Sequence, residues 1–66
     1  MHARHCFSWG DVSTCLVYGN VFETAIRCDK EEDSEWMIME QYDNAGAALD
    51  GHNKYVAQYV RKYGPA

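Results

Sequence analysis

One segment constrains the fold more than any other part of the chain, namely residues 43–63, which read D-N-A-G-A-A-L-D-G-H-N-K-Y-V-A-Q-Y-V-R-K-Y. Its apolar and aromatic residues and one histidine recur at the spacing of a single helix face: Ala45, Ala48, Leu49, His52, Tyr55, Val56, Tyr59, Val60 and Tyr63. Asp43 or Asn44 can cap the start of this helix, and Gly64 and Pro65 end it. A helix with one apolar stripe needs a surface to cover, so we expect a sheet in the preceding residues.

Two strands are indicated before the helix. Residues 12–18, V-S-T-C-L-V-Y, are rich in β-branched and aromatic residues, and Val12, Thr14, Leu16 and Tyr18 alternate with the others. Gly19 and Asn20 then suit a tight hairpin turn. Residues 21–28, V-F-E-T-A-I-R-C, return with Phe22, Thr24, Ile26 and Cys28 on one face and charged residues on the other. This alternation predicts one buried face and one wet face.

A third strand is predicted over Glu35–Gln41, although its Met and Glu residues leave a helix open as the alternative. Residues 1–10 show no clear period, and we expect them to be irregular, with Phe7 and Trp9 available to pack against the sheet or to pair as an edge. The predicted fold is therefore one small α+β domain over residues 1–66, a three-stranded antiparallel meander with one C-terminal helix on one face (β-β-β-α).

A sheet covered on one face only leaves apolar residues without cover on the other. Val17, Trp36 and Ile38 are expected there, or Met37 and Met39 if the third strand has the opposite register. Such a patch is typical of self-association or of a binding partner.

Acidic residues are concentrated in the middle of a chain of net charge -4. Seven of the ten acids fall between residues 29 and 43, where Lys30 is the one base. Direct nucleic-acid binding requires the opposite, a basic patch, so we do not expect it. The tyrosines at 55, 59 and 63 favour helix packing over base stacking, because Lys54, Arg61 and Lys62 are the only nearby bases.

The three cysteines, Cys6, Cys15 and Cys28, are an odd number, which favours reduced thiols over a disulfide framework. No apolar run reaches the roughly 20 residues that span a membrane. The first ten residues do not resemble a signal peptide. We therefore expect a cytoplasmic protein without a membrane partner.

Two groups of residues bear on metal binding and catalysis. His2, His5 and Cys6, with Cys15 or Cys28, are zinc-ligand types, but their spacing does not match a zinc motif, so no metal or other cofactor is expected. His52 can be a general base assisted by Asp50 or Glu23. The favoured alternative is a ring that packs on the sheet and donates a hydrogen bond, for example to Glu23 or Thr24, with Gly51 permitting close approach of helix and sheet. No nucleophile stands beside it, so we expect no enzyme and no catalytic residue.

The order of several short motifs resembles a group of small uncharacterised proteins of tailed phages and prophages. The residues that carry the resemblance are V-S-T-C-L-V-Y at 12–18, F-E-T-A-I at 22–26, A-x-x-G-H at 48–52, and Val56. The turn at Gly19 and Asn20 is shorter than the glycine-rich segment of that group, so any role of that segment is absent here. The resemblance implies a phage or prophage setting and little about chemistry.

These patterns together predict a small phage-type protein that binds another protein. The expected binding residues lie in the acidic loop and at the start of the third strand: Asp29, Glu31, Glu32, Asp33, Glu35, Trp36 and Ile38. The sharpest form of this hypothesis is an acidic inhibitor of a host defence complex, of anti-CRISPR or anti-restriction type, whose acids occupy a basic nucleic-acid groove in the host cytoplasm. The alternative is a structural or assembly protein that forms a homodimer.

Overall fold

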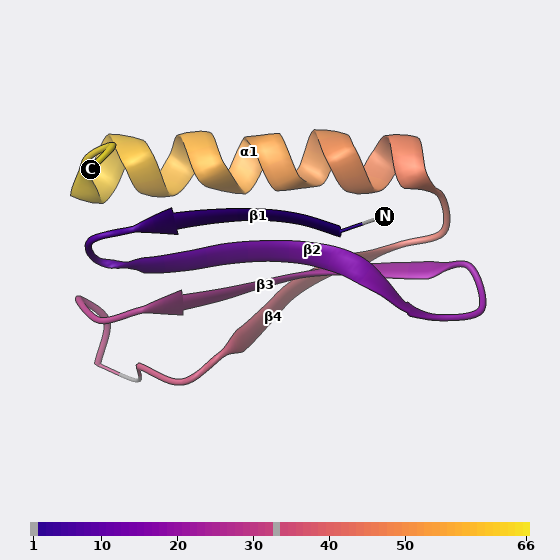
Figure 1. Ribbon diagram of the computed structural model, residues 1–66, viewed down its shortest axis with the longest axis horizontal. Coiled ribbons are helices and arrows are strands. Elements are labelled where there is room, and N and C mark those ends of the chain that lie inside the picture. The colour runs from indigo at the N-terminus through magenta and orange to yellow at the C-terminus, as the bar shows by residue number, and fades with distance from the viewer. Residues whose placement is uncertain (1, 33) are drawn as a thin grey trace.

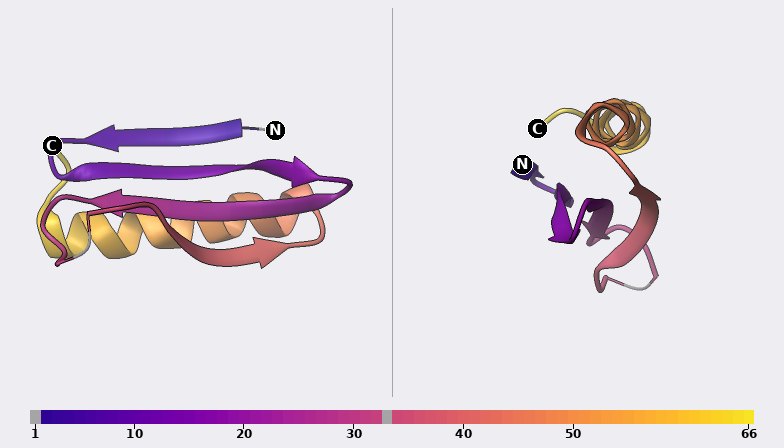
Figure 2. Two further views of the ribbon diagram at one scale, coloured as in Figure 1. Left: turned by 90° about the horizontal axis from the view of Figure 1, so that it is seen from below. Right: turned by 90° about the vertical axis from the view of Figure 1, so that its right-hand side faces the viewer.

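A four-stranded antiparallel sheet and one helix make up the fold in the computed structural model, which describes residues 2–32 and 34–66. The elements are β1 (His2–Phe7), β2 (Gly10–Tyr18), β3 (Val21–Cys28), β4 (Met37–Tyr42) and the helix α1 (Ala45–Tyr63). The strands lie side by side in chain order. Figure 1 shows α1 running along the sheet, and the end-on view in Figure 2 shows the helix on one side of the twisted strands.

The prediction of three strands is wrong, because residues 2–7 form a fourth strand at the edge of the sheet. This strand, β1, pairs with β2 from His2 opposite Cys15 to Phe7 opposite Gly10. Its inward positions hold an alanine, a histidine and a phenylalanine, so the apolar alternation is interrupted in the middle. Backbone hydrogen bonds to β2 hold such an edge strand, and they leave little trace in the side-chain pattern.

The predicted faces of the central hairpin are confirmed over most of its length. Phe22, Thr24, Ile26 and Cys28 of β3 are all buried against the helix side, as are Val12 and Thr14 of β2. Leu16 and Tyr18 are instead 46% and 65% exposed, so the predicted inward pattern fails at the end of β2. The pairing shifts between these two residues, where a β-bulge lies, and Gly19 makes the turn at φ 52°.

The core lies at the end of the sheet where the β1–β2 turn meets the end of α1. Trp9, Val12, Ile26, Cys28 and Tyr59 form its buried cluster. The Trp9 ring stacks on Phe7 and Tyr59, with centroids 4.6 and 5.6 Å away, and its Nε1–H donates to the carbonyl oxygen of Gly64 over 2.9 Å. Trp9 was expected in an irregular segment. Its contacts with Tyr59 and Gly64 connect the β1–β2 turn to the C-terminal end of the helix.

The helix begins and ends at the predicted caps. The Asn44 side-chain oxygen accepts a hydrogen bond from the Ala47 amide over 2.8 Å, and Gly64 closes the helix at φ 98°. The middle of the predicted stripe is buried at Ala48, His52 and Tyr59. Its first members are not, since Ala45 is exposed and Leu49 is 49% exposed. The helix therefore covers the sheet with its central and C-terminal turns.

Candidate functional site

The surface of the sheet opposite α1, called the open face below, is formed by side chains that pair across the strands. One row holds Cys6, Asp11 and Arg27, the next Arg4, Ser13, Ala25 and Ile38, and the third His2, Cys15, Glu23 and Gln41. The middle of this face carries the small side chains of Ser13 and Ala25. No helix covers it, as the views in Figure 2 show.

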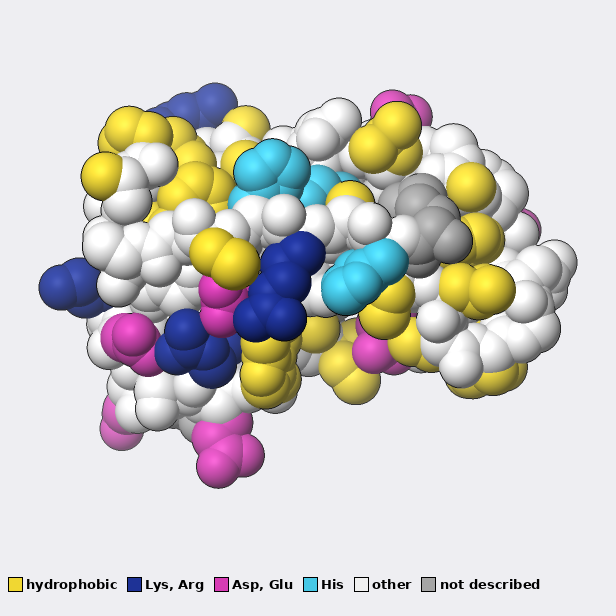
Figure 3. Space-filling view, in the orientation of Figure 1, with side chains coloured by type: hydrophobic (Ala, Val, Ile, Leu, Met, Phe, Trp, Pro, Cys, Tyr) yellow, Lys and Arg dark blue, Asp and Glu magenta, His cyan; other side chains and the backbone are white. Residues whose placement is uncertain are grey.

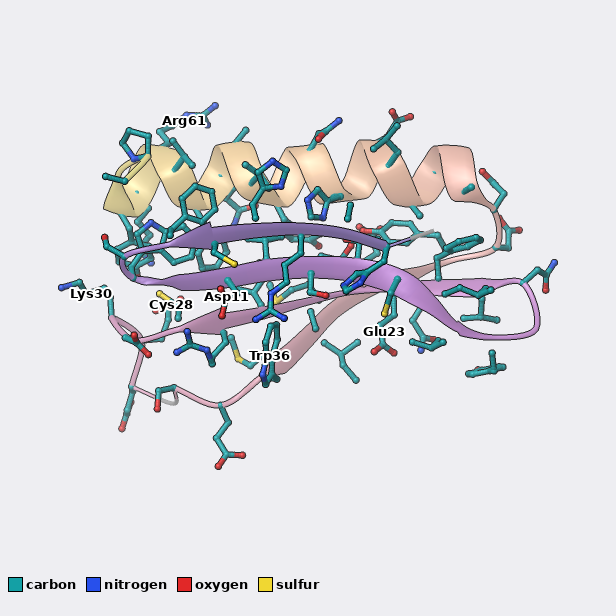
Figure 4. All side chains as sticks on the ribbon, viewed as in Figure 1. Asp11, Glu23, Cys28, Lys30, Trp36 and Arg61 are labelled. Carbon is teal, nitrogen blue, oxygen red and sulfur yellow. The ribbon has the colours of Figure 1, made fainter. Side chains whose placement is uncertain are left out.

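Trp36 lies on this open face, as predicted. Its ring contacts another side chain of the face, so it is only partly exposed to solvent. The Arg4 guanidinium carbon is 5.8 Å from the centroid of the Trp36 ring. Arg4 belongs to β1, and Trp36 directly precedes β4, at the other edge of a sheet whose outer strands are about 14 Å apart at ordinary spacing. The two side chains must therefore extend toward each other over the two central strands. The small side chains of Ser13 and Ala25 on these strands leave space for them. Figure 4 shows Trp36 close to Asp11 in projection.

The other predicted apolar residues are exposed as well. Ile38 pairs with Ala25 and is 64% exposed, while Val17 at the hairpin bulge is 40% exposed. Met37 is 37% exposed and Met39 packs partly against the core. A β-bulge in β4 between its pairings with Thr24 and Ala25 causes this mixed pattern, so neither predicted register holds along the whole strand.

Charged side chains form one edge of the open face. Asp11 lies between two guanidinium groups, 3.5 Å from Arg4 and 3.0 Å from Arg27, and Arg27 also bonds Asp29 over 2.5 Å. A hydrogen bond from the Cys6 thiol and the Arg27 and Arg4 charges lower the pKa of Asp11, although burial opposes the shift. Figure 3 shows basic and acidic side chains side by side next to hydrophobic ones. The sequence does not reveal this network, because Arg4, Asp11 and Arg27 come from three different strands.

The predicted acidic binding residues do not form one free row. Asp29 is engaged with Arg27, and Glu31 turns back to accept hydrogen bonds from Tyr63 over 3.0 Å and Tyr59 over 3.4 Å. Glu32 and Glu35 are exposed. Asp33 lies outside the described residues. Of the predicted acids, Asp29 and Glu31 therefore hold the loop against the rest of the molecule.

On the side of the sheet that faces α1, six polar side chains are linked by contacts of hydrogen-bond length. This series, called the polar chain below, begins on β1 and ends on β4. The six side chains are joined in the order His5, His52, Thr14, Thr24, Tyr42 and Glu40. His52 is 1% exposed, and Thr14 and Thr24 are fully buried. Figure 3 shows histidine side chains at the seam between α1 and β1. The inward position of His5, facing the helix, could not be predicted from the sequence.

His52 is packed on the sheet and hydrogen-bonded, as the favoured prediction has it, but its partners are other residues than the examples named. Its Nδ1 lies 2.8 Å from Thr14 Oγ1 and its Nε2 lies 2.8 Å from His5 Nδ1. Neither Asp50 nor Glu23, the predicted helpers of a general base, bonds to it, and Thr24 is reached only through Thr14. Burial, followed by the neighbouring imidazoles of His5 and His2, lowers the pKa of His52.

Gly51 permits close approach of the helix to the sheet, as predicted, and the group that approaches it is the side chain of Tyr42. A Cβ at this position would overlap the phenol ring and hydroxyl of Tyr42. The absence of a side chain on Gly51 therefore places the Tyr42 hydroxyl where it reaches Thr24 Oγ1 over 3.1 Å.

The candidate metal ligands near the N-terminus are divided between two surfaces. His5 faces the helix, whereas His2 and Cys6 belong to the open face. Within residues 2–32 and 34–66, no three His, Cys, Asp or Glu side chains are gathered as metal ligands. The three cysteines are free thiols, of which Cys28 is buried, Cys15 is half-buried and Cys6 is exposed.

Two open depressions lie beside the first turns of the helix. The first, of about 300 Å³, is lined by Glu40, Tyr42, Ala47, Asp50, Gly51 and Lys54. The second, of about 510 Å³, is lined by Val21, Gln41, Tyr42, Asp43 and Ala47. Lys54 bonds Glu40 over 2.9 Å at the rim of the first depression, and this bond lowers the pKa of Glu40.

The geometry defines a small α+β protein in which one helix packs on a four-stranded antiparallel meander and the opposite sheet face is left open. Comparison with models of protein families, with curated proteins and with solved structures finds no match to this chain. Across the part of the chain that the structure describes, no helix has the length and apolar character needed to cross a membrane.

Proposed function

We propose that this chain is a small non-catalytic module that binds another protein through its open face. The observation that carries this proposal is the position of Trp36, which lies half-exposed over the open face beside Ile38, itself 64% exposed. Aromatic side chains surrounded by polar and charged groups are the usual anchors of protein interfaces. The network of Arg4, Asp11 and Arg27 forms such a charged edge.

The partner that fits this surface presents an apolar contact flanked by Lys or Arg. The loop that leads into Trp36 carries the exposed acids Glu32 and Glu35, and the whole chain has a net charge of -4. An acidic loop beside an apolar anchor attracts a basic rim and accelerates association. This complementarity favours a basic protein partner over a nucleic acid.

The acidic inhibitor of a host defence complex is the narrower form of the same proposal. It is supported by the acidic composition of residues 29–35 and by the resemblance to phage and prophage proteins, which implies a host cytoplasm. Asp29 and Glu31 are engaged within the chain, so the inhibitor would rely on the exposed Glu32 together with the apolar anchor. Binding through acids alone has less support from this geometry than binding through Trp36.

Affinity capture with matched variants tests the proposal. The tagged protein is exposed to a bacterial lysate, eluted with rising salt, and the captured protein is identified by mass spectrometry, purified and titrated calorimetrically. We expect Trp36→Ala to weaken this affinity about 30-fold, which corresponds to an anchor worth about 2 kcal/mol. Leu49→Ala is the control, because Leu49 is 49% exposed but lies on the helix. Equal affinities of the two variants would reject the open face as the binding surface.

The role of the acids needs a separate variant. Glu32→Lys reverses the charge of an exposed loop acid without removing the contacts of Asp29 or Glu31. We expect it to weaken binding at low salt and to flatten the dependence of affinity on salt. An unchanged affinity would reject the acidic-inhibitor form while leaving the apolar anchor in place.

A homodimer is the second candidate, and the balance of charge at one edge of the open face favours it. Two arginines and two aspartates neutralise one another at this edge, so two copies could meet there without strong repulsion: Arg4, Arg27, Asp11 and Asp29. Sedimentation over a range of concentrations distinguishes the candidates. A dimer that dissociates in Trp36→Ala supports self-association, and a monomer at all concentrations rejects it.

A further inference from the structure

The strand β4 lies at the edge of the sheet, and its outer side is free. It pairs with β3 alone, and no other strand of the described chain lies beside it. Beyond the β-bulge, Glu40, Gln41 and Tyr42 pair with β3 in regular succession. The outer side of an edge strand presents backbone N–H and C=O groups with which an added strand can pair. The last three residues of β4 therefore offer a short template for a further strand.

The two depressions form one groove beside this template, called the edge groove below. Both are lined by Tyr42 and Ala47, so they adjoin. The first continues between β4 and the early turns of α1 as far as Lys54, and the second continues around the end of β4 to Val21. The end-on view in Figure 2 shows β4 rising to the helix on this side. A strand added to β4 would thus run along the edge groove.

The side chains of an added strand would alternate in step with those of β4. Glu40 and Tyr42 pair with the buried residues Thr24 and Phe22, so they lie on the helix side of the sheet. Gln41, between them, belongs to the open face. A residue placed opposite Glu40 would therefore direct its side chain to the helix side, where the first depression lies.

Contacts within the chain hold the walls of the edge groove in place. Gly51 allows the Tyr42 ring to lie against the helix, since a Cβ on this residue would overlap the ring. Lys54 Nζ and the Tyr42 hydroxyl lie 2.9 and 3.3 Å from Glu40 Oε1. Side chains that are already ordered lose little further entropy when a ligand binds, so the groove is prepared for one.

The charge of the edge groove is negative. Three carboxylates line it, those of Glu40, Asp43 and Asp50, together with the ammonium group of Lys54. Lys54 is paired with Glu40, whereas Asp43 and Asp50 are exposed and form no ion pair within residues 2–32 and 34–66. Carboxylates without a basic partner favour Lys or Arg side chains on the strand that pairs beside them.

The same charges disfavour two other arrangements. If two copies paired through their β4 strands, Glu40 and Asp43 of one copy would lie near the same acids of the other, and like charges on paired strands are destabilising. The opposite edge of the sheet, β1, carries Arg4 and no acid, so it would not attract a basic segment. The edge groove therefore fits a basic strand that comes from another protein.

We propose that the edge groove binds an extended, basic segment of another protein, which adds a strand to the sheet along Glu40–Tyr42. The backbone of this segment pairs with β4. One of its Lys or Arg side chains enters the first depression and donates hydrogen bonds to Asp50 beside Glu40. This surface is separate from the open face that carries Trp36, so binding at either surface can be tested without the other.

A synthetic peptide tests the proposal by nuclear magnetic resonance titration of the folded chain. The probe is Thr-Lys-Val-Arg-Val-Lys-Thr with blocked ends, which places its basic side chains on one face of an extended strand. The comparison peptide has proline in place of both valines, which keeps the charge and prevents strand pairing. We expect the probe to shift the backbone amide signals of Glu40, Gln41 and Tyr42, and the proline peptide to leave them in place. Equal shifts with both peptides, or none with either, would overturn the proposal.

Two variants of equal net charge separate the edge groove from general attraction. Asp50→Asn and Gln58→Lys each raise the net charge of -4 by one unit, but only Asp50 lines the groove. Gln58 is exposed and lies about two turns further along α1. We expect Asp50→Asn to weaken binding of the probe about fivefold and Gln58→Lys to change it by less than about twofold. Equal affinities of the two folded variants would reject the groove.

Two further measurements identify other occupants and other surfaces. Shifts at Glu40–Tyr42 that appear when the protein is concentrated without peptide would identify a second copy as the occupant and overturn the proposal. Trp36→Ala should bind the probe as the unchanged chain does, because Trp36 does not line the groove. Loss of probe binding in this folded variant would place the peptide on the open face and would also overturn the proposal.

Discussion

The guanidinium of Arg4 lies over the ring of Trp36, 5.8 Å from its centroid, and this contact joins the first strand to the residue that leads into the last. It explains why Trp36 is 46% exposed and not fully projecting into solvent. The open face is therefore partly closed by the residue best suited to anchor a partner.

The Arg4–Trp36 contact should be measurable as a coupling free energy. In a double-mutant cycle with Arg4→Ala and Trp36→Ala, we expect about 0.5–1 kcal/mol, the range of an exposed cation–π contact. Urea unfolding of the four proteins at low and high salt gives this value. Additive effects of the two substitutions would show that the contact contributes nothing to stability.

Thr14→Val should destabilise the fold because it breaks the polar chain at a fully buried point. Valine keeps the shape of the side chain, but it leaves His52 Nδ1 and Thr24 without the hydroxyl that bonds both. We expect a loss of about 1–3 kcal/mol in the free energy of unfolding. Ser13→Ala, at the neighbouring position on the open face, serves as the control and should change stability by less than about 0.5 kcal/mol.

Gly51→Ala should be destabilising even though alanine is the better helix former. The new Cβ would overlap the ring of Tyr42, the last residue of β4. Overpacking of this kind costs about 1–3 kcal/mol, more than the roughly 1 kcal/mol gained from helix propensity. Asp50→Ala, one residue earlier and exposed, is the matched control for thermal unfolding. A more stable Gly51→Ala variant would contradict the close approach.

The stability of the protein should fall in two separate steps as the pH is lowered. The pKa of His52 is lowered from 6.5, so the unfolded chain takes up this proton more readily than the folded one, and stability decreases as the pH falls below about 6.5. The pKa values of Asp11 and Glu40 are lowered from 3.8 and 4.5. Their contribution is present above these values and is lost as the pH falls through the lowered ones.

Urea unfolding at a series of pH values resolves the two steps. The upper step should be absent in His52→Gln and retained in His2→Gln, because His2 is exposed on the open face. An upper step that survives in His52→Gln would assign it to another group.

Much of the local structure could be predicted from the sequence because it depends on short-range patterns. The caps at Asn44 and Gly64 and the buried face of β3 follow from residues within a few positions of one another. The strand β1 could not be predicted in this way. Its pairing depends on backbone bonds to β2, and the inward position of His5 hides its alternation.

The candidate site shows the same division. The sequence alone predicted apolar residues on the uncovered side of a sheet, either Trp36 and Ile38 or Met37 and Met39, because it did not decide the register of that strand. It could not show that Glu31 turns back to Tyr63, that Arg4 reaches Trp36, or that His5 meets His52. These pairs are far apart in the chain, and only the packing of β1 and α1 on the central hairpin brings them within bonding distance. The sequence thus determined the helix, the central hairpin and the strand that follows it, with most of their faces, because these depend on short-range patterns. The tertiary structure decided the edge strand β1 and which charged and polar side chains meet, because these depend on residues far apart in the chain.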